Sequence, residues 1–329
     1  MKGSVVGKYL IVALLSVVLL KPINTFAQQR RPILFWNLEN YFDPFDDSLT
    51  RDDEFTPGGQ RHWSWRRFET KRNHIAKVLI ALKDEVGEFP VIAAFAEVEN
   101  RFVLEQLVTA TPLVKLGYKV IHRDSPDRRG IDVALIYRED FFIPLEINNI
   151  EVVLPNASPT RDILKVRGIF SGNGVEPEDT VNIFVIHFPS KWGSAQESLS
   201  RRKGAANVLV EQLESIEYQN VIVMGDFNDT PDSEIFEILG SRMDVMGGEQ
   251  EELSQGSIKY KGRWELIDNF LISENFSLGW EFSLFRPSLL LEEDSQYLGH
   301  KPYRTYIGPR YNGGVSDHLP VYIYIVRKW

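Results

Sequence analysis

The amino-acid sequence predicts an α/β domain in which two packed β-sheets are covered by helices. Short β-type runs recur along the chain, a few segments between them space their apolar residues as a helix does, and no change of composition divides the chain. An apolar content of 43% is ordinary for a globular protein with a sizeable core. We therefore expect one large domain over residues 28–329.

The expected elements follow from the spacing of the apolar side chains. The β-type runs are 33–36, 91–96, 118–122, 133–137, 147–154, 163–170, 181–187, 221–224, 266–273 and 321–326. Apolar residues at i, i+3, i+4 and i+7 predict an amphipathic helix from about Arg66 to Lys83. A second helix follows the polar segment 198–203 and reaches Leu213, and a shorter helix covers 102–108.

The N-terminal residues have the pattern of a secretory signal peptide. A lysine-containing start precedes an apolar run at 9–20 and a small-residue cleavage motif at 25–27. A membrane span takes about 20 apolar residues, and Pro22 interrupts this stretch, so cleavage after Ala27 is favoured over a retained N-terminal anchor. The cleavage site has no cysteine, which excludes a lipoprotein anchor. Residues 1–27 therefore predict a secreted or periplasmic bacterial protein.

Charge and cysteine content narrow the class of protein further. The chain has no cysteine, which suits a periplasmic or surface protein and argues against a small domain held by disulfides. The net charge of −9 becomes −12 once Lys2, Lys8 and Lys21 leave with the signal peptide. Such a protein is not built for long non-specific tracking along nucleic acid. It can still bind a polyanion locally, through metal ions and a few clustered basic side chains.

Polar side chains stand at the ends of five predicted strands. They are Asn37 and Glu39 after 33–36, Glu97 after 91–96, His187 after 181–186, Asp226 and Asn228 after 221–224, and Asp317 and His318 in a glycine loop before 321–326. Taken singly, such residues are usually turn formers. Together they indicate a cleft at the edge of the sheets, because α/β proteins place polar groups there.

The chemical types of these residues fit one reaction class. Mg²⁺ prefers oxygen ligands, and oxygen donors are offered by Glu39, Glu97, Asp226, Asn228 and Asp317. The two histidines can exchange protons with an attacking water or a leaving oxygen. The sequence has no zinc-type cluster, P-loop, Gly-x-Ser-x-Gly motif or cysteine nucleophile. The remaining chemistry is metal-assisted attack of water on phosphorus.

A set of motifs along the chain resembles the endonuclease/exonuclease/phosphatase superfamily. The motifs are Trp36-Asn37-Leu38-Glu39, Ala96-Glu97, Gly130-Ile131-Asp132-Val133, His187, Gly225-Asp226-Phe227-Asn228, Asp268 and Ser316-Asp317-His318. The superfamily includes deoxyribonuclease I-like enzymes, exonuclease III-like repair nucleases, neutral sphingomyelinases and inositol polyphosphate 5-phosphatases. Segments 187–191 and 260–264 resemble a secreted bacterial subgroup. The resemblance covers residues 33–326 and implies a deoxyribonuclease I-like, four-layer α/β sandwich of two mixed β-sheets flanked by α-helices.

The resemblance also implies a metal site. By position, Glu97 is the principal metal ligand, with Asn37 and Glu39 beside it and Asp317 joining the metal shell. Glu39 stands where many relatives have Asp, and the extra methylene could shift its carboxylate. The expected cofactor is Mg²⁺, with Mn²⁺ or Ca²⁺ as alternatives.

The same resemblance implies the catalytic groups. Asp226 and Asn228 position the attacking water or the phosphate, and His318 is a general base or a phosphate contact, oriented by Asp268. A second pair is expected between Asp132 and His187, with His187 stabilising the phosphate or protonating the leaving oxygen. The alternative for Asp132 is that it caps a turn.

Basic and aromatic residues are candidates for substrate contacts. Arg128 and Arg129 are expected to contact substrate phosphates. The basic segment 201–203 is better explained as a solvated surface cluster. Segment 62–67 interleaves aromatic and basic residues, which suits stacking on a nucleotide or sugar, although packing on the domain is favoured. Structural or surface roles are expected for His74, His122 and His300.

The leading functional hypothesis is a secreted, metal-dependent phosphoesterase that cleaves phosphodiester bonds, with nucleic acid as the leading substrate and endonuclease action expected. The first alternative is a phosphatase or phospholipase-type hydrolase acting on lipid or sugar phosphates. The second is a noncatalytic surface binding protein on the same scaffold, which predicts the loss of at least one chemical group. We expect a monomer that is not inserted in a membrane after signal cleavage.

Overall fold

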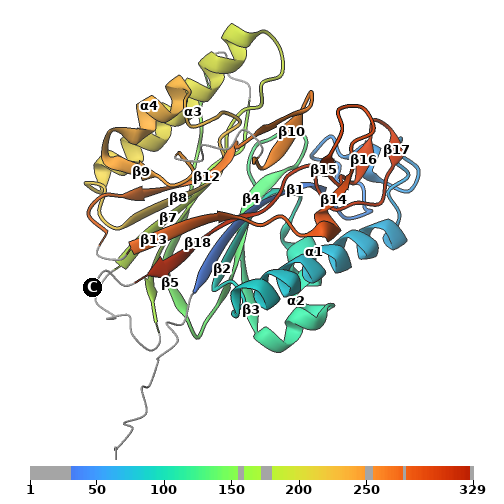
Figure 1. Cartoon of the computed structure of the whole chain (residues 1–329), viewed down its shortest axis with the longest axis horizontal. Coiled ribbons are helices and arrows are strands. Elements are labelled where there is room, and N and C mark those ends of the chain that lie inside the picture. Colours follow the sequence, from blue (N-terminus) through green and yellow to red (C-terminus); the bar gives the residue numbers. More distant parts are fainter. Residues whose placement is uncertain (1–30, 155–158, 172–179, 249–254, 277–278, 327–329) are drawn as a thin grey trace, which may run out of the picture.

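Two six-stranded β-sheets stack face to face in the part of the chain that the computed structural model describes, namely residues 31–154, 159–171, 180–248, 255–276 and 279–326 (Figure 1). The first sheet has the order β13 (Gly279–Leu284), β18 (Val321–Val326), β1 (Pro32–Tyr41), β2 (Ile92–Val98), β4 (Asp132–Arg138), β3 (Tyr118–His122). The second has the order β5 (Phe142–Ile150), β6 (Ile163–Phe170), β7 (Thr180–His187), β8 (Val221–Asp226), β12 (Asp268–Ser273), β9 (Met243–Val245). The predicted signal peptide lies outside the described residues.

Both sheets are mixed. Strands β1 and β2 are parallel in the first sheet, and β7 and β8 are parallel in the second. The other neighbouring strands of each described sheet are antiparallel. Parallel neighbours end at the same edge of a sheet, so the polar residues in the last part of β1 and β2, and those at the ends of β7 and β8, are brought together in pairs.

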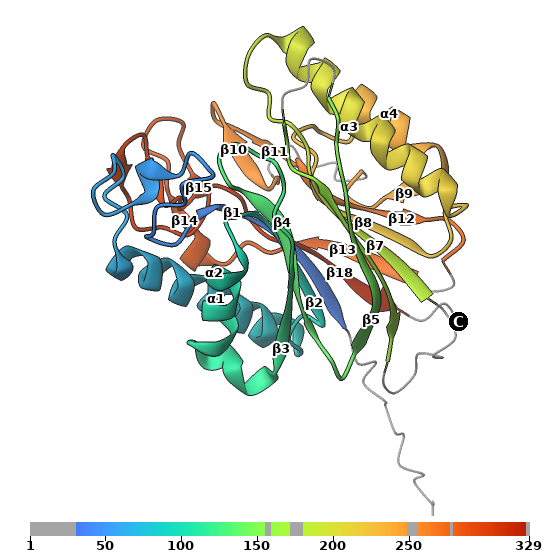
Figure 2. The ribbon, with the colours of Figure 1, turned by 180° about the vertical axis from the view of Figure 1, so that it is seen from behind.

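Helices cover the outer faces of the two sheets. Helices α1 (Trp65–Val86) and α2 (Arg101–Thr109) lie on the first sheet, and α3 (Ala195–Ser215) and α4 (Glu234–Leu239) lie on the second (Figure 2). The layers are thus helix, sheet, sheet and helix, which confirms the predicted four-layer sandwich. Within the described residues, no helix is long and apolar enough to cross a membrane.

Alternation along the strands explains the layers. In β1, Leu34 and Trp36 pack against the helices, whereas Ile33 and Phe35 pack between the sheets. In β8, Ile222 points into the layer between the sheets. These strands are covered on both faces, so their sequences are apolar at successive positions and do not alternate with polar residues.

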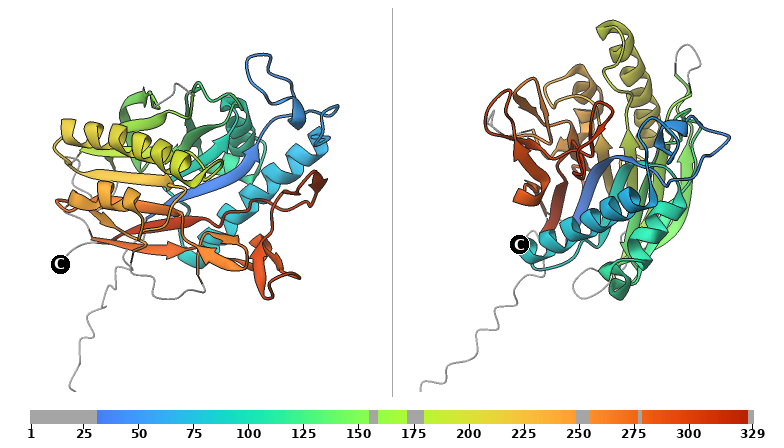
Figure 3. Two further views of the ribbon diagram at one scale, coloured as in Figure 1. Left: turned by 90° about the horizontal axis from the view of Figure 1, so that it is seen from above. Right: turned by 90° about the vertical axis from the view of Figure 1, so that its right-hand side faces the viewer.

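Short 3₁₀ turns and two-stranded pairs connect the main elements. They are the 3₁₀ turns at Asp53–Phe55, Pro112–Leu116, Gly240–Arg242 and Ser288–Leu290, and the strand pairs β10 (Ile258–Tyr260) with β11 (Arg263–Glu265), β14 (Leu291–Glu293) with β15 (His300–Pro302), and β16 (Tyr306–Ile307) with β17 (Arg310–Tyr311). The β16–β17 pair lies beside the start of α1 (Figure 3). There the Arg67 guanidinium stacks 4.3 Å from the centre of the Tyr311 ring.

Several boundaries differ from the sequence prediction. Strand β5 spans Phe142–Ile150 instead of 147–154, because it pairs with β6 along its whole length, starting from Phe142 opposite Phe170. Strand β12 begins at Asp268 instead of 266. Helix α1 matches its expected range within a few residues, and α3 begins earlier, at Ala195, where Ser194 caps it.

Candidate active site

Strand ends from both sheets converge on Asp226, the last residue of β8. Asn37 of β1 donates from Nδ2 to Asp226 Oδ2 at 3.0 Å, which joins the first sheet to the second. Within the second sheet, Asp226 lies between His187 of β7 and Asp268 of β12 in the strand register. Gly225 lets β7 and β8 lie close together at this point, because a Cβ there would lie 2.2 Å from the backbone oxygen of Ile186.

His318 and Asp268 are joined by a short contact between their side chains. The His318 Nδ1 atom lies 2.7 Å from Asp268 Oδ2, and Asp268 is completely buried. The other ring nitrogen, Nε2, lies 3.9 Å from Asp226 Oδ2 and 4.0 Å from Asp317 Oδ1. Burial alone would lower the pKa of His318, but these carboxylates, Asp268 first, raise that pKa well above its usual value. The ring is therefore held as an imidazolium.

The loop before β18 fixes the position of His318. Ser316 Oγ donates to Asn37 O at 2.7 Å and accepts from His318 N at 3.0 Å. Trp36 Nε1 donates to His318 O at 2.9 Å. Gly314 is required because a Cβ there would lie 2.0 Å from the backbone oxygen of Tyr303. The loop is thus tied to β1 on both sides of Asp317.

Asp226 is a buried carboxyl group with several partners. In addition to the bond from Asn37, its Oδ1 accepts from the backbone N–H of Asn228 at 2.8 Å. Burial, followed by the charge of Asp268, raises the pKa of Asp226 to about 7. Asn228 has a left-handed backbone with φ of 50° and donates from Nδ2 to Phe188 O. Asp226 can therefore gain or lose a proton near neutral pH.

Glu97 lies at a shift in the strand register of the first sheet. The pairing of β2 with β4 shifts register between Ala96 and Val98, and Glu97 has a left-handed backbone with φ of 59°. A left-handed backbone is strained at a residue other than glycine, and such strain is common where a functional site fixes the direction of a side chain. Glu97 Oε2 accepts from Asn40 N at 2.8 Å, and Oε1 lies 3.9 Å from His187 Nε2.

His187 lies between the two carboxylates. Its Nε2 atom is 3.6 Å from Asp226 Oδ2 as well as 3.9 Å from Glu97 Oε1. Burial, helped by the positive charges of Arg161 and Arg129, lowers the pKa of His187 well below its usual value. The two histidines of the cluster therefore carry different charges: His187 is neutral and His318 is cationic.

Asp132 does not pair with His187 as the sequence predicted. Its Oδ2 lies 3.1 Å from His122 Nε2, and its Oδ1 accepts from Ser125 N at 3.0 Å. The reason is register: His122 lies opposite Ala134 in the β3–β4 ladder. Asp132 precedes Ala134 by two residues on the same face, which makes it a diagonal neighbour of His122.

Both carboxylate oxygens of Glu39 accept hydrogen bonds. Arg304 Nε donates to Oε1 at 3.1 Å, and Thr305 N donates to Oε2 at 2.7 Å. Arg304 also donates from Nη2 to Asp317 Oδ2 at 2.8 Å. The buried Lys71 donates to the backbone oxygen of Glu39. Burial raises the pKa of Glu39 to about 7 and lowers that of Lys71 to about 8.

Sequence reasoning missed three basic residues of this region, Lys71, Arg304 and Arg161. Arg161 is buried before β6, where it donates from Nη1 to Asp127 Oδ2 at 3.2 Å and from Nη2 to Phe188 O at 2.8 Å. No motif marks any of them. The predicted Arg129 is about half exposed, with Nε 3.7 Å from Asp127 Oδ1. Arg128, its neighbour, is exposed.

Two other sequence expectations can be compared with the structure. Trp63, in the aromatic segment 62–67, is fully buried and donates from Nε1 to Phe42 O, which confirms packing for this residue. Arg202, expected in a solvated cluster, is instead buried and donates from Nε to Asp229 Oδ2 at 3.0 Å. That expectation was wrong for Arg202, because this side of α3 faces the second sheet.

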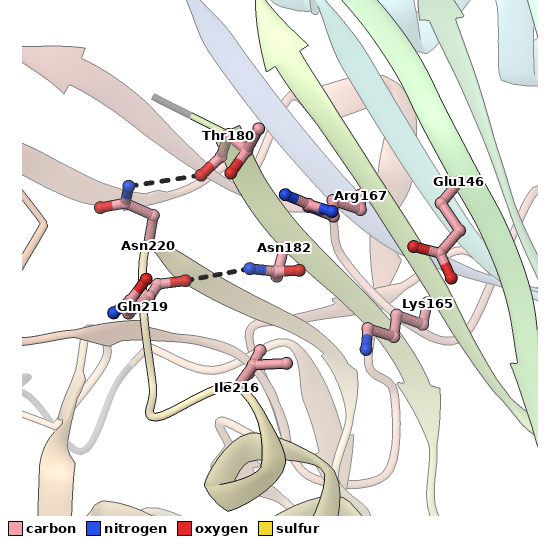
Figure 4. Close-up of a pocket in the computed structure, with 8 residues that line it drawn as sticks. All are labelled: Glu146, Lys165, Arg167, Thr180, Asn182, Ile216, Gln219 and Asn220. Atoms are coloured by element: carbon pink, nitrogen blue, oxygen red, sulfur yellow. Dashed lines mark hydrogen bonds between the residues drawn. The ribbon is translucent and has the colours of Figure 1, made fainter. Parts of the chain in front are cut away.

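A separate surface pocket of about 270 Å³ lies at the other end of β7 (Figure 4). It is lined by Glu146, Lys165, Arg167, Thr180, Asn182, Ile216, Gln219 and Asn220. Two hydrogen bonds, Asn220 Nδ2 to Thr180 O and Asn182 Nδ2 to Gln219 O, hold one side of it. Thr180 and His187 are the two ends of β7, so this pocket is not part of the candidate active site.

The fold and the cluster together define an α/β sandwich with carboxylates, amides and two imidazoles at one edge. The sequence profile described as the Endonuclease/Exonuclease/phosphatase family matches residues 32–327, so the chain belongs to that family. Members of the family are hydrolases that act on phosphoester bonds. A comparison with curated protein sequences finds no match.

Solved structures share the fold. An endonuclease/exonuclease/phosphatase family protein from Bacteroides thetaiotaomicron is 15% identical with a TM-score of 0.57, covering 91% of this chain and 98% of its own. A mannosyl-6-phosphatase from the same organism is also 15% identical, with a TM-score of 0.56 and coverages of 90% and 99%. D. rerio TDP2 complexed with single strand DNA product is 15% identical, with a TM-score of 0.54 and coverages of 90% and 98%.

Proposed function

We propose that this protein is a divalent-metal-dependent phosphodiesterase, with nucleic acid as its leading substrate. The observation that carries the proposal is the His318–Asp268 pair, whose free ring nitrogen faces Asp226 and Asp317. A cationic imidazole beside carboxylates that can hold a metal is suited to a phosphate group and its leaving oxygen.

The donor set fits a hard divalent cation. Glu97 and Asp226 offer carboxylate oxygens, and Asn37 Oδ1, which accepts from Glu39 N, keeps a second lone pair. Asp317 has one oxygen that is not bonded to Arg304. We assign Glu97, Asp226, Asn37 and Asp317 to Mg²⁺, or to Mn²⁺ or Ca²⁺. When bound, the cation would polarise a phosphoryl oxygen and lower the pKa of a water.

Glu39 has a different place in this proposal. Its two oxygens already accept from Arg304 and Thr305. We therefore assign it to holding Arg304 next to Asp317, where the guanidinium can face a phosphate oxygen. This changes the role that the sequence suggested for Glu39 from metal ligand to positioning residue.

The protonation states suggest how protons move. Asp226 would position the attacking water, because hydrogen bonds from Asn37 and from the backbone of Asn228 hold its carboxylate in place. The His318 imidazolium can contact the phosphate or donate a proton to the leaving oxygen, while Asp268 keeps the ring oriented. Asn228 positions the water or phosphate beside Asp226. His187, which is neutral, can donate one hydrogen bond to the phosphate.

Positive charge around the cluster supports an anionic substrate. Arg161 is buried behind His187, and Arg129 lies on an exposed loop held by Asp127. We assign Arg129 and its exposed neighbour Arg128 to contacts with substrate phosphates. Asp132 has no direct part here, because it is bonded to His122.

The alternatives differ in substrate and in chemistry. The solved TDP2 structure carries a single strand DNA product, which supports a nucleic-acid substrate here. The mannosyl-6-phosphatase likeness supports a sugar phosphomonoester as the alternative. A noncatalytic binding protein would lack at least one group, yet Glu97, Asp226 and His318 are all placed in one cluster.

A substrate panel tests the proposal. Mature protein is incubated with Mg²⁺ or Mn²⁺ and plasmid DNA, RNA, sphingomyelin or mannose 6-phosphate, and each product is measured. The nucleic-acid proposal predicts that DNA or RNA is cleaved fastest and that His318→Ala removes the activity. Faster release of inorganic phosphate from mannose 6-phosphate would contradict the nucleic-acid proposal and support the phosphatase alternative. Silence of the wild type on every substrate would favour the binding protein.

We also propose that residues 1–27 direct export and that the mature protein is monomeric. The mass of the protein recovered from the periplasm or medium of a bacterial host tests cleavage after Ala27. An intact N-terminus in the membrane fraction would instead indicate a retained anchor. Light scattering of the mature chain tests the monomer.

A further inference from the structure

A second group of histidine and aspartate side chains that are close enough to share a metal ion lies at β3 and β4, on the outer side of the first sheet. It contains His122 at the end of β3, Asp124 in the following loop and Asp132 at the start of β4. One ligand atom from each of these residues lies within 4.8 Å of the others. Glu97 lies on β2, and β4 separates β2 from β3. The cluster is therefore distinct from the candidate active site.

The orientation of His122 is that of a metal ligand. Its side chain is 3% exposed, and Nε2 donates to the Asp132 carboxylate at 3.1 Å. This bond fixes the tautomer and leaves the lone pair on Nδ1. Histidines that bind metals usually donate their other ring N–H to a carboxylate in this way. Among the described residues, Nδ1 has no hydrogen bond, and its nearest carboxylate oxygen is Asp124 Oδ1 at 3.8 Å.

The spacing of the two free donors suits one ion. Two ligand atoms that each lie about 2.1 Å from a tetrahedral zinc ion are about 3.4 Å apart. The observed separation of 3.8 Å between His122 Nδ1 and Asp124 Oδ1 is close to that value. The Asp124 side chain is 90% exposed and can move the remaining few tenths of an ångström without disturbing the fold.

These donors line a surface pocket of about 580 Å³. Its wall includes Asp162 and Asn149 as well as His122 and Asp124. The oxygen atoms of the wall can accept hydrogen bonds from waters that complete a coordination shell. The basic residue of the wall, Arg123, donates to Ile147 O at 3.3 Å. The pocket therefore offers an imidazole and two carboxylates to a cation.

We propose that His122 Nδ1 and the Asp124 carboxylate bind a divalent transition metal ion such as Zn²⁺, with Asp132 orienting the imidazole. The mixed nitrogen and oxygen donors favour Zn²⁺ over Mg²⁺, which takes oxygen ligands. The site is independent of the proposed phosphodiesterase chemistry. It would place a metal ion at the end of the first sheet where β2 also ends, which is the end that carries the candidate active site.

Zinc soaks of crystals and zinc content in solution test this site directly. Crystals of the mature protein are soaked in ZnCl₂, and an anomalous difference map is calculated at the zinc absorption edge. Equilibrium dialysis gives the bound zinc per chain. We expect an anomalous peak about 2.1 Å from His122 Nδ1. We also expect the Asp124→Asn and His122→Asn variants to lose one zinc per chain, or to bind it about tenfold or more weakly.

Asp140→Asn is the matched control, because Asp140 is also exposed but lies outside the cluster. This variant should keep the zinc content of the wild type. Asp124 is so exposed that its substitution should not unfold the protein, and thermal unfolding in the absence of zinc checks this. The absence of a peak at His122 in the wild type would overturn the proposal. So would a peak that persists at full height in both Asp124→Asn and His122→Asn.

Discussion

Individual environments shift the pKa values of the two histidines of the candidate active site in opposite directions. His187 is buried near Arg161 and Arg129, and its pKa is lowered well below the usual value. His318 is equally buried but bonded to Asp268, and its pKa is raised well above the usual value. The same residue type thus provides a neutral hydrogen-bond donor and a cation a few ångströms from one carboxylate, Asp226.

The Asp268→Asn variant should shift the pH dependence of the reaction. Removal of the carboxylate removes the main cause that raises the pKa of His318, so the imidazolium loses its proton at lower pH. If the imidazolium is the active form, activity falls as the pH rises through that pKa, and this alkaline limb should move to lower pH in the variant. We also expect kcat to fall by about 10²–10⁴-fold. A pH–rate profile with an unmoved alkaline limb would contradict this role.

Glu39→Gln and Glu97→Gln should have different effects. The charge of Glu39 is the main one that favours the ammonium form of the buried Lys71, and Glu39→Gln removes that charge. We expect a loss of about 3 kcal/mol in the free energy of unfolding. Glu97 has a side chain that is 16% exposed and no ion pair with Lys or Arg among the described residues.

Glu97→Gln should therefore weaken metal binding while changing stability by less than about 1 kcal/mol. Urea unfolding and calorimetric titration with Mn²⁺ measure the two effects on both variants. The reverse ranking, with Glu97→Gln unfolding the protein and Glu39→Gln abolishing metal binding, would show that the roles have been exchanged.

Elements were predictable where burial imposed a pattern on the sequence. The apolar runs of β1, β2 and β8 are covered on both faces, and β2 and β8 were expected within two residues. Strand β1 begins where expected but continues to Tyr41, five residues beyond its predicted end, because its last part carries the polar residues of the candidate site. Strand β5 was misplaced because most of its side chains are partly or fully exposed, so its sequence lacks an apolar run. The two- and three-residue strands from β14 to β17 have too few residues to show any period.

Ser194 stabilises the start of α3. Its hydroxyl accepts from the backbone N–H of Glu197 at 3.3 Å, which satisfies one of the first helical N–H groups. We expect Ser194→Ala to lower the free energy of unfolding by about 1 kcal/mol. Ser215→Ala, at the other end of the helix, is the control and should cost less than about 0.5 kcal/mol. Equal losses in urea unfolding would contradict a capping role.

At the scale of the whole molecule, the layer between the sheets holds the site together. Ile222 of β8 and Val185 of β7 are completely buried in that layer, a few residues before Asp226 and His187. Deletion of buried methyl groups costs the lost transfer free energy and leaves a cavity. The position of the polar groups of the candidate active site therefore depends on the packing of both sheets.

Ile222→Ala should lower the free energy of unfolding by about 2–5 kcal/mol. Because Ile222 does not contact the cluster by hydrogen bond or charge, the folded fraction should retain most of its activity at low temperature. Urea unfolding and assays at 10 °C, with Ile143→Ala on the half-exposed edge strand as control, measure both effects. A loss below 1 kcal/mol would contradict the assigned core position.

Much of the site was foreseeable because its motifs are local in sequence. Asp226 and Asn228 are two residues apart, as are Ser316 and His318, and each pair is joined by a hydrogen bond. The partner of Asp132 was not foreseeable, because it depends on the register of β3 with β4. Single basic residues such as Arg161 and Arg304 carry no local pattern that distinguishes them from surface arginines.

The central claim is that the cluster around His318 hydrolyses phosphodiesters with a divalent cation. The most direct test is the initial rate of bis-p-nitrophenyl phosphate hydrolysis by the mature protein with Mg²⁺ or Mn²⁺, compared with the EDTA-treated protein and with folded His318→Ala. We predict a metal-dependent rate that falls by at least about 10²-fold in His318→Ala. An equal rate in the wild type and in His318→Ala, or a rate that EDTA leaves unchanged, would contradict the account.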